Sequence, residues 1–359
     1  MKTLLLCPEL FARESGIQRI LRLYLKALCE TADAGDEVRL VVLNDSEFPA
    51  VQLQRYANDR LTLRRPCERH KPTFVWQALR LSAGVDRLVC GHIGQAPVAW
   101  LARRLRPRLD YFLVAHGLEA WRPYTWLERL ALRHARRILC VSDFTRREMQ
   151  RQIDLPESRF AVVPNALDPY LLVKLTDRTI PPGQQAPVIL AVARLDAKEG
   201  YKGVDHLIEA MPGILQTAAS ARLRIIGTGS DVPRLRSLAS RLDLGPAVEF
   251  VGAVDDETLR EAYQSCTLFA LPSRGEGFGI VFLEAMAQGK PCLGARAGAI
   301  PEVIDESSGV LVEYGDVAEI ARQVIWALQH PWHSGQIRRR AAQFSYPSFA
   351  GRLHQTLSA

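Results

Sequence analysis

The segment TLFALPSRGEGFGIVFLEAMAQGKPCLGARA, residues 267–297, places a glycine-rich loop and an apolar helical pattern between two apolar runs. The runs 267–273 and 291–297 have the length and composition of buried strands, whereas 279–289 repeats apolar residues at helical spacing. A strand, a loop, a helix and a second strand in this order are typical of parallel strands joined by a crossover helix. The segment therefore predicts an α/β fold.

The same alternation continues on both sides of this segment. Further continuous apolar runs of strand length lie at 2–7, 37–44, 86–92, 110–116, 136–142 and 160–165, and then at 188–195, 222–229, 248–254 and 309–313. Helical patterns fill most of the gaps between these runs. Apolar strands that alternate with helices indicate parallel sheets covered on both faces. We therefore predict two Rossmann-like domains in series that face each other across a cleft, with a ligand beyond the carboxyl ends of the strands.

A break in the pattern separates the two domains. Residues 166–187 contain four prolines and show no sustained periodicity, which favours a linker. We predict an N-terminal domain over 1–165, an interdomain linker over 166–187 and a C-terminal domain over 188–345. A C-terminal helix over 346–359 is expected to pack back on the N-terminal domain.

The composition is that of a protein with its own apolar cores. Of 359 residues, 48% are hydrophobic and 24% are charged, which are ordinary values for globular proteins. The seven cysteines form no paired motif, and several lie within apolar runs. We interpret them as buried thiols in a reducing compartment rather than as zinc ligands or disulfides.

The N-terminus and the charge distribution bear on location and partners. Glu9, Arg13 and Glu14 interrupt the region where a signal peptide would stay apolar, so we interpret this region as a strand. No apolar run approaches the ~20 residues that a membrane-spanning helix needs. Residues 1–165 hold 27 Lys and Arg against 18 Asp and Glu, within a chain of net charge +7. We expect a cytoplasmic protein, in contact at most with the inner face of the cell membrane, whose first half binds an anionic partner.

The glycine-rich loop offers groups suited to a phosphate and a sugar. Glycines at 275, 277 and 279 let backbone N–H groups approach a ligand, and the start of the following helix adds a positive dipole end. Glu276 and Glu284 repel phosphate but accept hydrogen bonds from sugar hydroxyls. Together these groups point to a nucleotide sugar. The alternative is that Glu276 is a surface residue and Glu284 only favours the helix dipole.

Two cations of the C-terminal domain fit such a diphosphate. Arg194 follows the strand at 188–195, and Lys202 precedes a glycine and the next helix. An arginine fork and a lysine point charge commonly bind phosphates together. Each cation alone would more often be a surface residue, and Lys198 is a rival to Lys202.

The segment from Pro272 to Ile304 resembles the Glu-x7-Glu signature of the retaining GT-B glycosyltransferases, in particular glycosyltransferase family 4. Further resemblances cover most of the chain. ESGIQR (14–19) is similar to the family's first glycine loop, VAHGLEAW (114–121) to its histidine segment, VVPNALD (162–168) to its Pro-Asn-Gly-Val-Asp stretch, ARL with YKG (193–203) to its diphosphate clamp, and VEFVGAV (248–254) to its base-proximal strand end. The combined match is specific, whereas each piece alone is not.

The resemblance implies a role for each matching position. A catalytic set would consist of His116 near the transferring sugar, Glu276 on the donor sugar, and Arg194 with Lys202 on the diphosphate. Further donor contacts would come from Gly16, Gly277, Phe278, Gly279, Ile280, Val281 and Glu284, and base-proximal contacts from Gly252, Ala253 and Val254. Glu284 would accept the ribose hydroxyls. Without the resemblance, His116 would more often be a structural histidine.

Three departures from the family pattern concern the loops. Gly16 is a single glycine where two adjacent ones are common, and Ala166 occupies a position where glycine is common. Lys202 lies three residues beyond the usual spacing of the clamp lysine, which keeps Lys198 open as an alternative. None of these departures removes a charged group that the chemistry requires.

The resemblance implies transfer of a sugar, with retention of configuration, from a nucleotide-diphosphate sugar that is UDP- or GDP-linked. The acceptor would be a hydroxyl of a saccharide or of a polyprenyl-diphosphate-linked saccharide, in the synthesis of cell-surface polysaccharide or glycolipid. The family's mechanism is a front-face displacement in which the leaving phosphate oxygen accepts the acceptor's proton. The sequence has no convincing Asp-x-Asp metal site, so we expect neither metal nor cofactor.

Other functions fit parts of the sequence. A glycoside hydrolase also needs paired carboxylates, and a non-catalytic nucleotide-sugar binding protein would keep the same clamp. Residues 225–232 contain a Gly-x-Gly that suggests a nicotinamide dehydrogenase, but the third glycine is lacking. Comparing turnover of nucleotide-activated sugars with turnover of unactivated sugars separates a transferase from a hydrolase and from a non-catalytic binding protein. A test of NAD binding separates a dehydrogenase from all three.

The basic segments 101–110 and 125–137 bear on the acceptor. In the second segment, cations recur at helical spacing beside apolar residues: Arg129, Arg133, Arg136 or Arg137, with Trp126, Leu127 and Leu130. This pattern indicates either a solvated helix face or a contact with anionic lipid near a lipid-linked acceptor. Nucleic acid is not an expected partner, because no binding module is recognisable.

Overall fold

A computed structural model describes residues 1–12, 15–31, 35–170 and 186–359 of the chain. The chain divides into two compact units. Unit 1 comprises Met1–Tyr170 and Ser345–Ala359, and unit 2 comprises Leu171–Phe344. Most of the predicted linker, residues 171–185, lies outside the described residues. Ala166 and Leu167, at the start of that predicted linker, are buried.

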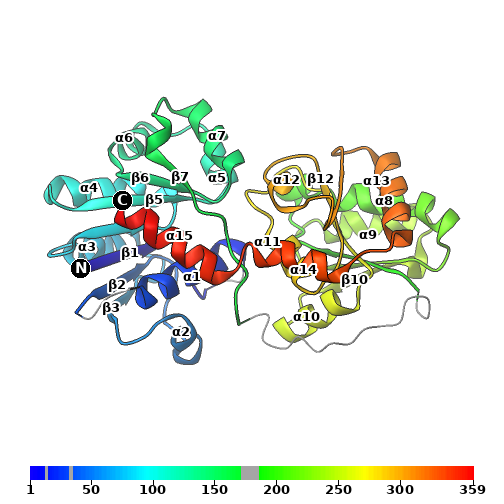
Figure 1. The fold of residues 1–359 in the computed structure, drawn as a ribbon, viewed down its shortest axis with the longest axis horizontal. Coiled ribbons are helices and arrows are strands. Elements are labelled where there is room, and N and C mark those ends of the chain that lie inside the picture. The colour runs from blue at the N-terminus through cyan, green and yellow to red at the C-terminus, as the bar shows by residue number, and fades with distance from the viewer. Residues whose placement is uncertain (13–14, 32–34, 171–185) are drawn as a thin grey trace. The chain divides into compact units, whose positions relative to one another are not determined.

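Unit 1 is built on a parallel sheet of seven strands in the order β3-β2-β1-β4-β5-β6-β7 (Figure 1). The strands are β1 (Lys2–Cys7), β2 (Glu37–Val42), β3 (Leu61–Pro66), β4 (Arg87–Cys90), β5 (Asp110–Ala115), β6 (Arg137–Cys140) and β7 (Phe160–Val162). Every residue of β4, and every residue of β1 after Lys2, is buried. Strands buried on both faces are apolar throughout, which explains why these runs lack the alternation of a half-exposed strand.

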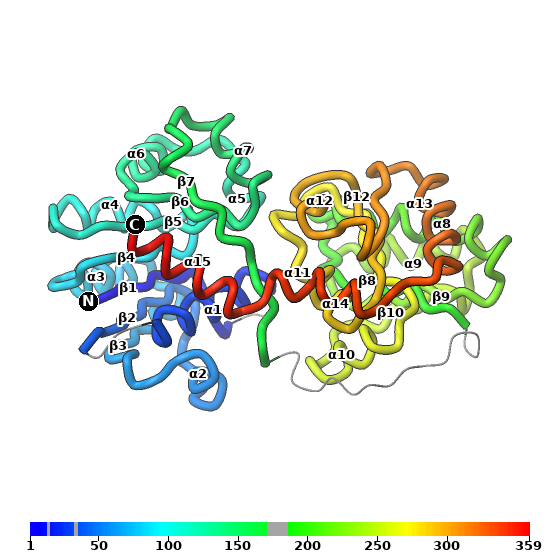
Figure 2. Tube along the Cα trace, viewed as in Figure 1, coloured from blue at the N-terminus to red at the C-terminus, as the bar shows by residue number. Residues whose placement is uncertain are grey.

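Helices cover this sheet. They are α1 (Gly16–Glu30), α2 (Ala50–Tyr56), α3 (Lys71–Leu81), α4 (Ala96–Leu105), α5 (Leu118–Trp121), α6 (Trp126–His134), α7 (Asp143–Gln152) and α15 (Tyr346–Ser358), with the short 3₁₀ turns η1 (Ile93–Gln95) and η2 (Glu157–Arg159). The last helix, α15, runs beside α1 (Figure 2), and the rings of Phe349 and Tyr24 meet edge to face with centroids 5.1 Å apart. Arg136 also donates a 2.9 Å hydrogen bond to the carbonyl oxygen of Ala359. The C-terminal residues thus complete unit 1.

Unit 2 is built on a parallel sheet of six strands in the order β10-β9-β8-β11-β12-β13. Its strands are β8 (Val188–Val192), β9 (Arg222–Ile226), β10 (Val248–Gly252), β11 (Leu268–Leu271), β12 (Cys292–Ala295) and β13 (Gly309–Val312). Its helices are α8 (Val204–Thr217), α9 (Val232–Arg241), α10 (Asp256–Ser265), α11 (Ile280–Ala287), α12 (Ile300–Val303), α13 (Val317–Gln329) and α14 (Ser334–Ala342), with the 3₁₀ turns η3 (Ala197–Lys202) and η4 (Gly245–Ala247). The two sheets confirm the predicted α/β class with two Rossmann-like units.

The structure adds one strand that the sequence pattern did not indicate. In β3 the side chains are half-buried or exposed, and Arg64 and Arg65 point to solvent. This strand lies at the edge of the sheet and pairs only with β2. An edge strand needs little apolar surface, so its composition resembles that of a loop. The seven cysteines, all within the described residues, are buried free thiols.

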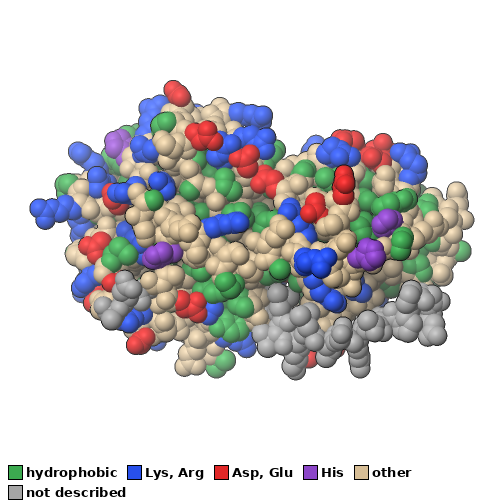
Figure 3. All heavy atoms as spheres, viewed as in Figure 1, with side chains coloured by type: hydrophobic (Ala, Val, Ile, Leu, Met, Phe, Trp, Pro, Cys, Tyr) green, Lys and Arg blue, Asp and Glu red, His purple; other side chains and the backbone are tan. Residues whose placement is uncertain are grey.

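Two arginines of the basic segment around α6, Arg129 and Arg136, make contacts within unit 1. Arg129 donates hydrogen bonds to the carbonyl oxygens of Tyr124 and Gln152, at 3.3 and 3.1 Å. Arg136 pairs with Asp110 at 2.6 Å. Both arginines therefore hold segments of unit 1 together. Figure 3 shows Asp and Glu side chains interspersed with Lys and Arg on the visible face of this unit.

Candidate functional site

In unit 2 the order of strands reverses between β8 and β11, which lie side by side in the sheet. From β8 the chain adds β9 and β10 on one side of this strand, and it then adds β11, β12 and β13 on the other side. Ligands of open α/β sheets bind beyond the carboxyl ends of the strands at such a reversal. The loop after β8 carries Arg194 and Lys202, and the loop after β11 carries Glu276. The fold thus brings the two predicted donor-binding segments to one place.

The two loops are held together by their backbones. The N–H of Arg274 donates to the carbonyl oxygen of Tyr201 at 2.9 Å. Gly275 lies against the ring of Tyr201, so that a Cβ atom at this position would be 2.5 Å from a ring carbon. Gly203 has φ +71°, and a Cβ atom there would be 2.4 Å from the carbonyl oxygen of Pro272. The glycines at these positions therefore permit a close approach of the chain to itself.

Lys202 and Glu276 form an ion pair across the two loops. The Nζ atom of Lys202 lies 2.6 Å from Oε1 of Glu276, and the side chains are 19% and 13% exposed. Burial by itself lowers the pKa of the Lys202 ammonium, but the charge and hydrogen bond of Glu276 outweigh it and raise this pKa above its ordinary value. Lys202 is therefore charged at neutral pH. Lys198, the rival clamp residue, is exposed on η3.

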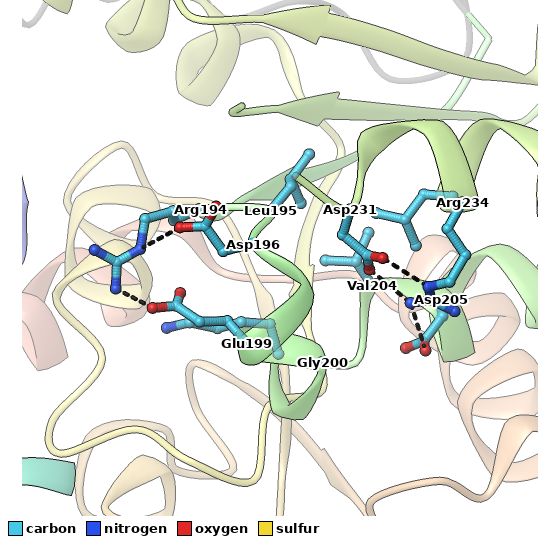
Figure 4. Close-up of a pocket in the computed structure, with 11 residues that line it drawn as sticks. Arg194, Leu195, Asp196, Glu199, Gly200, Val204, Asp205, Asp231 and Arg234 are labelled. Carbon is cyan, nitrogen blue, oxygen red and sulfur yellow. Dashed lines mark hydrogen bonds and ion pairs between the residues drawn. The ribbon is translucent and has the colours of Figure 1, made fainter. Parts of the chain in front are cut away.

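Arg194 lines a pocket on unit 2 together with Lys202 and Glu199 (Figure 4). Its guanidinium hydrogen-bonds to Glu199, and its Nε atom lies 3.6 Å from Asp196. The hydrogen bond to Glu199 raises the pKa of Arg194. The side chain is 59% exposed, so the guanidinium stays within reach of a ligand.

A second group of charges borders the same pocket. Arg234 donates two hydrogen bonds of 2.7 Å to Asp231 and one of 3.2 Å to Asp205. The bonds to Asp231 raise the pKa of Arg234 further above its ordinary value. Figure 4 shows this group on the side of the pocket opposite Arg194. Asp231 and Asp205 therefore hold the Arg234 side chain in place.

The loop that carries Glu276 is fixed at both ends. The carbonyl oxygen of Glu276 accepts a 3.0 Å hydrogen bond from the N–H of Ala299. Gly298 has φ +60°, and a Cβ atom there would lie 2.7 Å from that carbonyl oxygen. Phe278 is buried and packs edge to face on Phe344, with ring centroids 5.5 Å apart. These contacts position the loop in front of α11.

Helix α11 begins after Gly279, which has φ +92° and serves as the N-cap. The residues Ile280 and Val281 form its first turn, as the glycine-loop prediction requires. Glu284 lies further along α11 and is buried, and its Oε2 atom accepts a 2.8 Å hydrogen bond from the hydroxyl of Tyr263 on α10. Tyr263 thereby orients the carboxylate predicted to receive the ribose hydroxyls.

The predicted base-proximal residues lie at the end of edge strand β10. Gly252 is the last residue of this strand, with φ +88° at a shift in register, and its carbonyl oxygen accepts a 2.9 Å hydrogen bond from the N–H of Gly227. Ala253 is exposed and Val254 is half-buried. Gly252 ends the strand and the other two residues follow it, on the same edge of the sheet as the clamp loops.

Gly16 and His116 belong to unit 1. Gly16 is the first residue of α1 and is exposed. His116 follows β5 and is buried, and its Nε2 atom lies 2.8 Å from the carbonyl oxygen of Gly91. Its backbone N–H donates to Glu119 at 2.6 Å. The ring is therefore held in a fixed orientation at the carboxyl end of the sheet.

Four residues of these sites were not anticipated from the sequence: Glu199, Tyr201, Tyr263 and Gly298. Tyr201 and Tyr263 act through partners distant in the chain and Gly298 acts through its backbone conformation, so no local pattern marks them. Glu199 pairs with Arg194 on the same loop. Among the described residues, no group of three or more His, Cys, Asp and Glu side chains could hold a metal ion. The same residues include no helix long and apolar enough to span a membrane.

Two family models match the chain, one in each unit. Residues 15–170 match the model described as Glycosyltransferase Family 4, and residues 186–330 match the model described as Glycosyl transferases group 1.

Among curated proteins, the chain is 34% identical over 175 residues to a GDP-mannose-dependent monoacylated alpha-(1-6)-phosphatidylinositol monomannoside mannosyltransferase of Corynebacterium glutamicum. That alignment covers 47% of this chain and 42% of the relative. An N-acetyl-alpha-D-glucosaminyl L-malate synthase of Bacillus anthracis is 35% identical over 149 residues, which are 41% of this chain and 38% of the relative. The chain thus spans less than half the length of these curated relatives.

Among solved structures, the Anabaena protein HepE in complex with UDP superposes with a TM-score of 0.78 at 19% identity, covering 100% of both chains. The fold is therefore that of the GT-B class of glycosyltransferases. Each unit carries a glycosyltransferase domain, of family 4 in unit 1 and of group 1 in unit 2. The named relatives are transferases, which does not favour a hydrolase or a non-catalytic binding protein.

Proposed function

We propose that the chain transfers a sugar from a nucleotide-diphosphate sugar to a hydroxyl of a saccharide or of a lipid-linked saccharide, with retention of configuration. The donor would be GDP- or UDP-linked. GDP-mannose appears in the name of one relative, and UDP is bound in the HepE structure. No metal ion or cofactor takes part in this proposal.

The observation that carries the proposal is the meeting of the Arg194–Lys202 segment with the Glu276 loop where β8 and β11 adjoin. At this place the cations of Arg194 and Lys202, the glycine-rich loop, the N-terminus of α11 and the carboxylate of Glu276 occur together. A diphosphate needs the cations and the backbone N–H groups. A sugar hydroxyl needs the carboxylate. No single one of these groups would distinguish a nucleotide sugar from a simple phosphate.

In the proposed reaction, the bond between the sugar's anomeric carbon and the diphosphate oxygen breaks, and a bond to the acceptor oxygen forms on the same face. The acceptor's proton passes to the departing phosphate oxygen. Arg194 and Lys202 stabilise the negative charge that develops on the diphosphate. Glu276 holds the sugar, and Glu284, oriented by Tyr263, accepts hydrogen bonds from the ribose.

A thermal-shift panel of UDP, GDP, ADP, CMP and dTDP, each with EDTA, tests this proposal. A nucleotide at 100 times its dissociation constant should add about 2.7 kcal/mol to the free energy of unfolding. We expect one nucleotide to stabilise the wild type but not Arg194→Ala or Glu284→Gln. Arg241→Ala, which removes an exposed arginine of α9, is the matched control and should respond like the wild type. A wild type that no nucleotide stabilises would exclude the donor site.

We also propose that unit 1 contacts an anionic membrane surface near a lipid-linked acceptor. Trp126 at the start of α6 is 72% exposed, and Leu118 at the start of α5 is 45% exposed. Large exposed apolar side chains suit the interface of a bilayer. Since Arg129 and Arg136 are engaged within the fold, Arg133, which is exposed, is the cation of α6 that remains for lipid headgroups.

A further inference from the structure

Two neighbouring loops of unit 1 contain buried polar atoms that the fold leaves unpaired. Gln95 and His116 are only 6% and 7% exposed. Within the described part of the chain, the Oε1 and Nε2 atoms of Gln95 and the Nδ1 atom of His116 have no hydrogen-bond partner. Nearly all buried polar atoms of folded proteins are paired, so such a group needs an explanation.

The two residues lie at the same edge of the sheet. Gln95 ends η1, the turn that follows β4, and His116 directly follows β5. The strands β4 and β5 are adjacent and parallel, with Cys90 opposite Leu113, and η1 packs against both β5 and α5. The rings of His92, which begins this turn, and His116 have centroids 6.4 Å apart. Gln95 and His116 therefore lie on neighbouring loops beyond the carboxyl ends of β4 and β5.

The hydrogen bond to Gly91 fixes what His116 can offer. A carbonyl oxygen only accepts, so the Nε2 atom must carry the proton that it donates to Gly91. A neutral ring then leaves Nδ1 as an acceptor. Position 91 requires a glycine, because a Cβ atom there would lie 2.6 Å from the Leu21 side chain and 2.8 Å from the carbonyl oxygen of Leu6.

Gln95 offers the complementary groups. It stands at the N-cap of α4, yet its side chain makes no capping hydrogen bond. Its amide provides an NH₂ donor and a carbonyl acceptor on the turn that packs against β5, the strand that His116 directly follows. A hydroxyl group both donates and accepts, so the hydroxyl groups of one saccharide can donate to Nδ1 and accept from the amide. The groups carry no net charge, which favours a hydroxyl over a phosphate or a cation.

We propose that Gln95, together with Nδ1 of His116, forms a subsite that receives hydroxyl groups of a saccharide, and that Gln95 is a specificity-determining residue. This inference rests on the proposed transfer of a sugar. The hydroxyl groups belong either to the sugar of the donor or to the acceptor saccharide, since both present the same chemistry. In either case the saccharide hydroxyls form the hydrogen bonds that the Gln95 amide and Nδ1 of His116 do not make within the protein.

The test compares the wild type with Gln95→Met, which keeps the shape of the side chain and removes both polar groups. In the first arm, thermal shifts are measured with UDP against UDP-glucose and with GDP against GDP-mannose. In the second arm, binding of methyl α-D-mannopyranoside and methyl α-D-glucopyranoside is measured by saturation-transfer NMR, with and without the nucleotide that stabilises the protein. Gln77→Met on α3 is the matched control, because the Oε1 atom of Gln77 is also buried and unpaired.

If the donor's sugar occupies the subsite, Gln95→Met loses the extra thermal shift of the nucleotide sugar over the nucleotide. If the acceptor occupies it, Gln95→Met weakens pyranoside binding by roughly tenfold and keeps that extra shift. Gln77→Met should behave like the wild type in both arms. The inference is overturned if Gln95→Met matches the wild type in both arms, or if the wild type itself shows neither effect. Stabilisation by the bare nucleotide in those cases would leave the proposed function intact.

Discussion

The Nζ atom of Lys202 lies 2.6 Å from Oε1 of Glu276, although 74 positions separate the two residues in the chain. This ion pair joins the loop after β8 to the loop after β11. We expect Lys202→Met to lower the free energy of unfolding by about 2 kcal/mol, because Glu276 would keep a poorly solvated charge without its partner. Urea denaturation measures the change.

Lys198→Met is the control for this ion pair. Lys198 is exposed on the same turn, so its replacement should change the stability by less than about 0.5 kcal/mol. The same comparison decides which lysine holds the diphosphate, because only Lys202→Met should abolish the thermal shift by nucleotide. Equal effects of the two variants would argue against the ion pair.

The hydroxyl of Tyr263 should matter for both stability and nucleotide affinity. Tyr263→Phe removes a buried 2.8 Å hydrogen bond to Glu284, and we expect a loss of about 1 kcal/mol in the free energy of unfolding. Nucleotide affinity, measured by calorimetry, should fall several-fold because the carboxylate is no longer oriented. Tyr314→Phe, which removes a longer bond of 3.3 Å to Gly200, should leave the affinity near that of the wild type. An unaltered affinity in Tyr263→Phe would show that Glu284 needs no such support.

Gly298→Ala tests the packing of the Glu276 loop. The φ of +60° alone disfavours alanine by about 1–2 kcal/mol. The new Cβ atom would also lie 2.7 Å from the carbonyl oxygen of Glu276, which should displace the loop and abolish transfer. Gly84→Ala separates the two effects, because Gly84 has φ +67° and no atom within 4 Å of an added Cβ. Similar losses of stability in the two variants would mean that the close contact is unimportant.

Glu128 should make the stability of unit 1 sensitive to acid. It accepts hydrogen bonds from Arg122 at 2.6 and 3.0 Å and completes the capping box of α6 with Thr125. The hydrogen bond from Arg122 lowers the pKa of Glu128 in the folded state. Because the pKa of Glu128 is lower in the folded state than in the unfolded state, its ionised form stabilises the fold above the unfolded-state pKa of about 4.3. This stabilisation is lost as the pH falls through the folded-state pKa. The difference in stability between the wild type and Glu128→Gln, about 1 kcal/mol at pH 7, should therefore shrink below pH ~4.3. Chemical denaturation from pH 3 to pH 7 measures it, and a difference that does not vary with pH would contradict the assignment.

Vesicle flotation tests the proposed membrane contact. Trp126→Ser should weaken binding to vesicles that contain phosphatidylglycerol by roughly tenfold, because the exposed ring supplies apolar contact at the interface. Trp76→Ser is the matched control, since Trp76 is 55% exposed but lies on α3. Equal binding by the wild type and both variants, or no preference for anionic lipid, would count against a specific contact through α6.

The sequence predicted the strands of both sheets where the strands are buried on two faces. Runs such as 188–195 and 267–273 stood out because parallel strands covered by helices must be continuously apolar. Their carboxyl ends were placed too late, since β8 ends at Val192 and β11 at Leu271. The residues that follow include the apolar Ala193, Leu195 and Pro272, but they lie in the loops that approach the candidate site. Edge strand β3 escaped prediction because it buries little side-chain surface.

The candidate site was predictable where residue type and local spacing carry the chemistry, as with Glu276 and the glycines around it. It was not predictable where a partner comes from another element. Nothing local to Tyr263 marks it as the residue that orients Glu284, and nothing local to Gln95 shows that its amide is left unpaired. Such relationships arise only when the sheet order brings distant loops together.

The return of α15 to unit 1 has a consequence for biosynthesis. Unit 1 consists of Met1–Tyr170 and Ser345–Ala359, so unit 2 is an insertion within it. A ribosome must translate all of unit 2 before the helix that covers α1 emerges. Until then the ring of Tyr24 lacks its contact with Phe349, and this apolar surface is open to chaperones or to a neighbouring nascent chain. Unit 2 can reach its native state first, and the earlier-made unit is completed last.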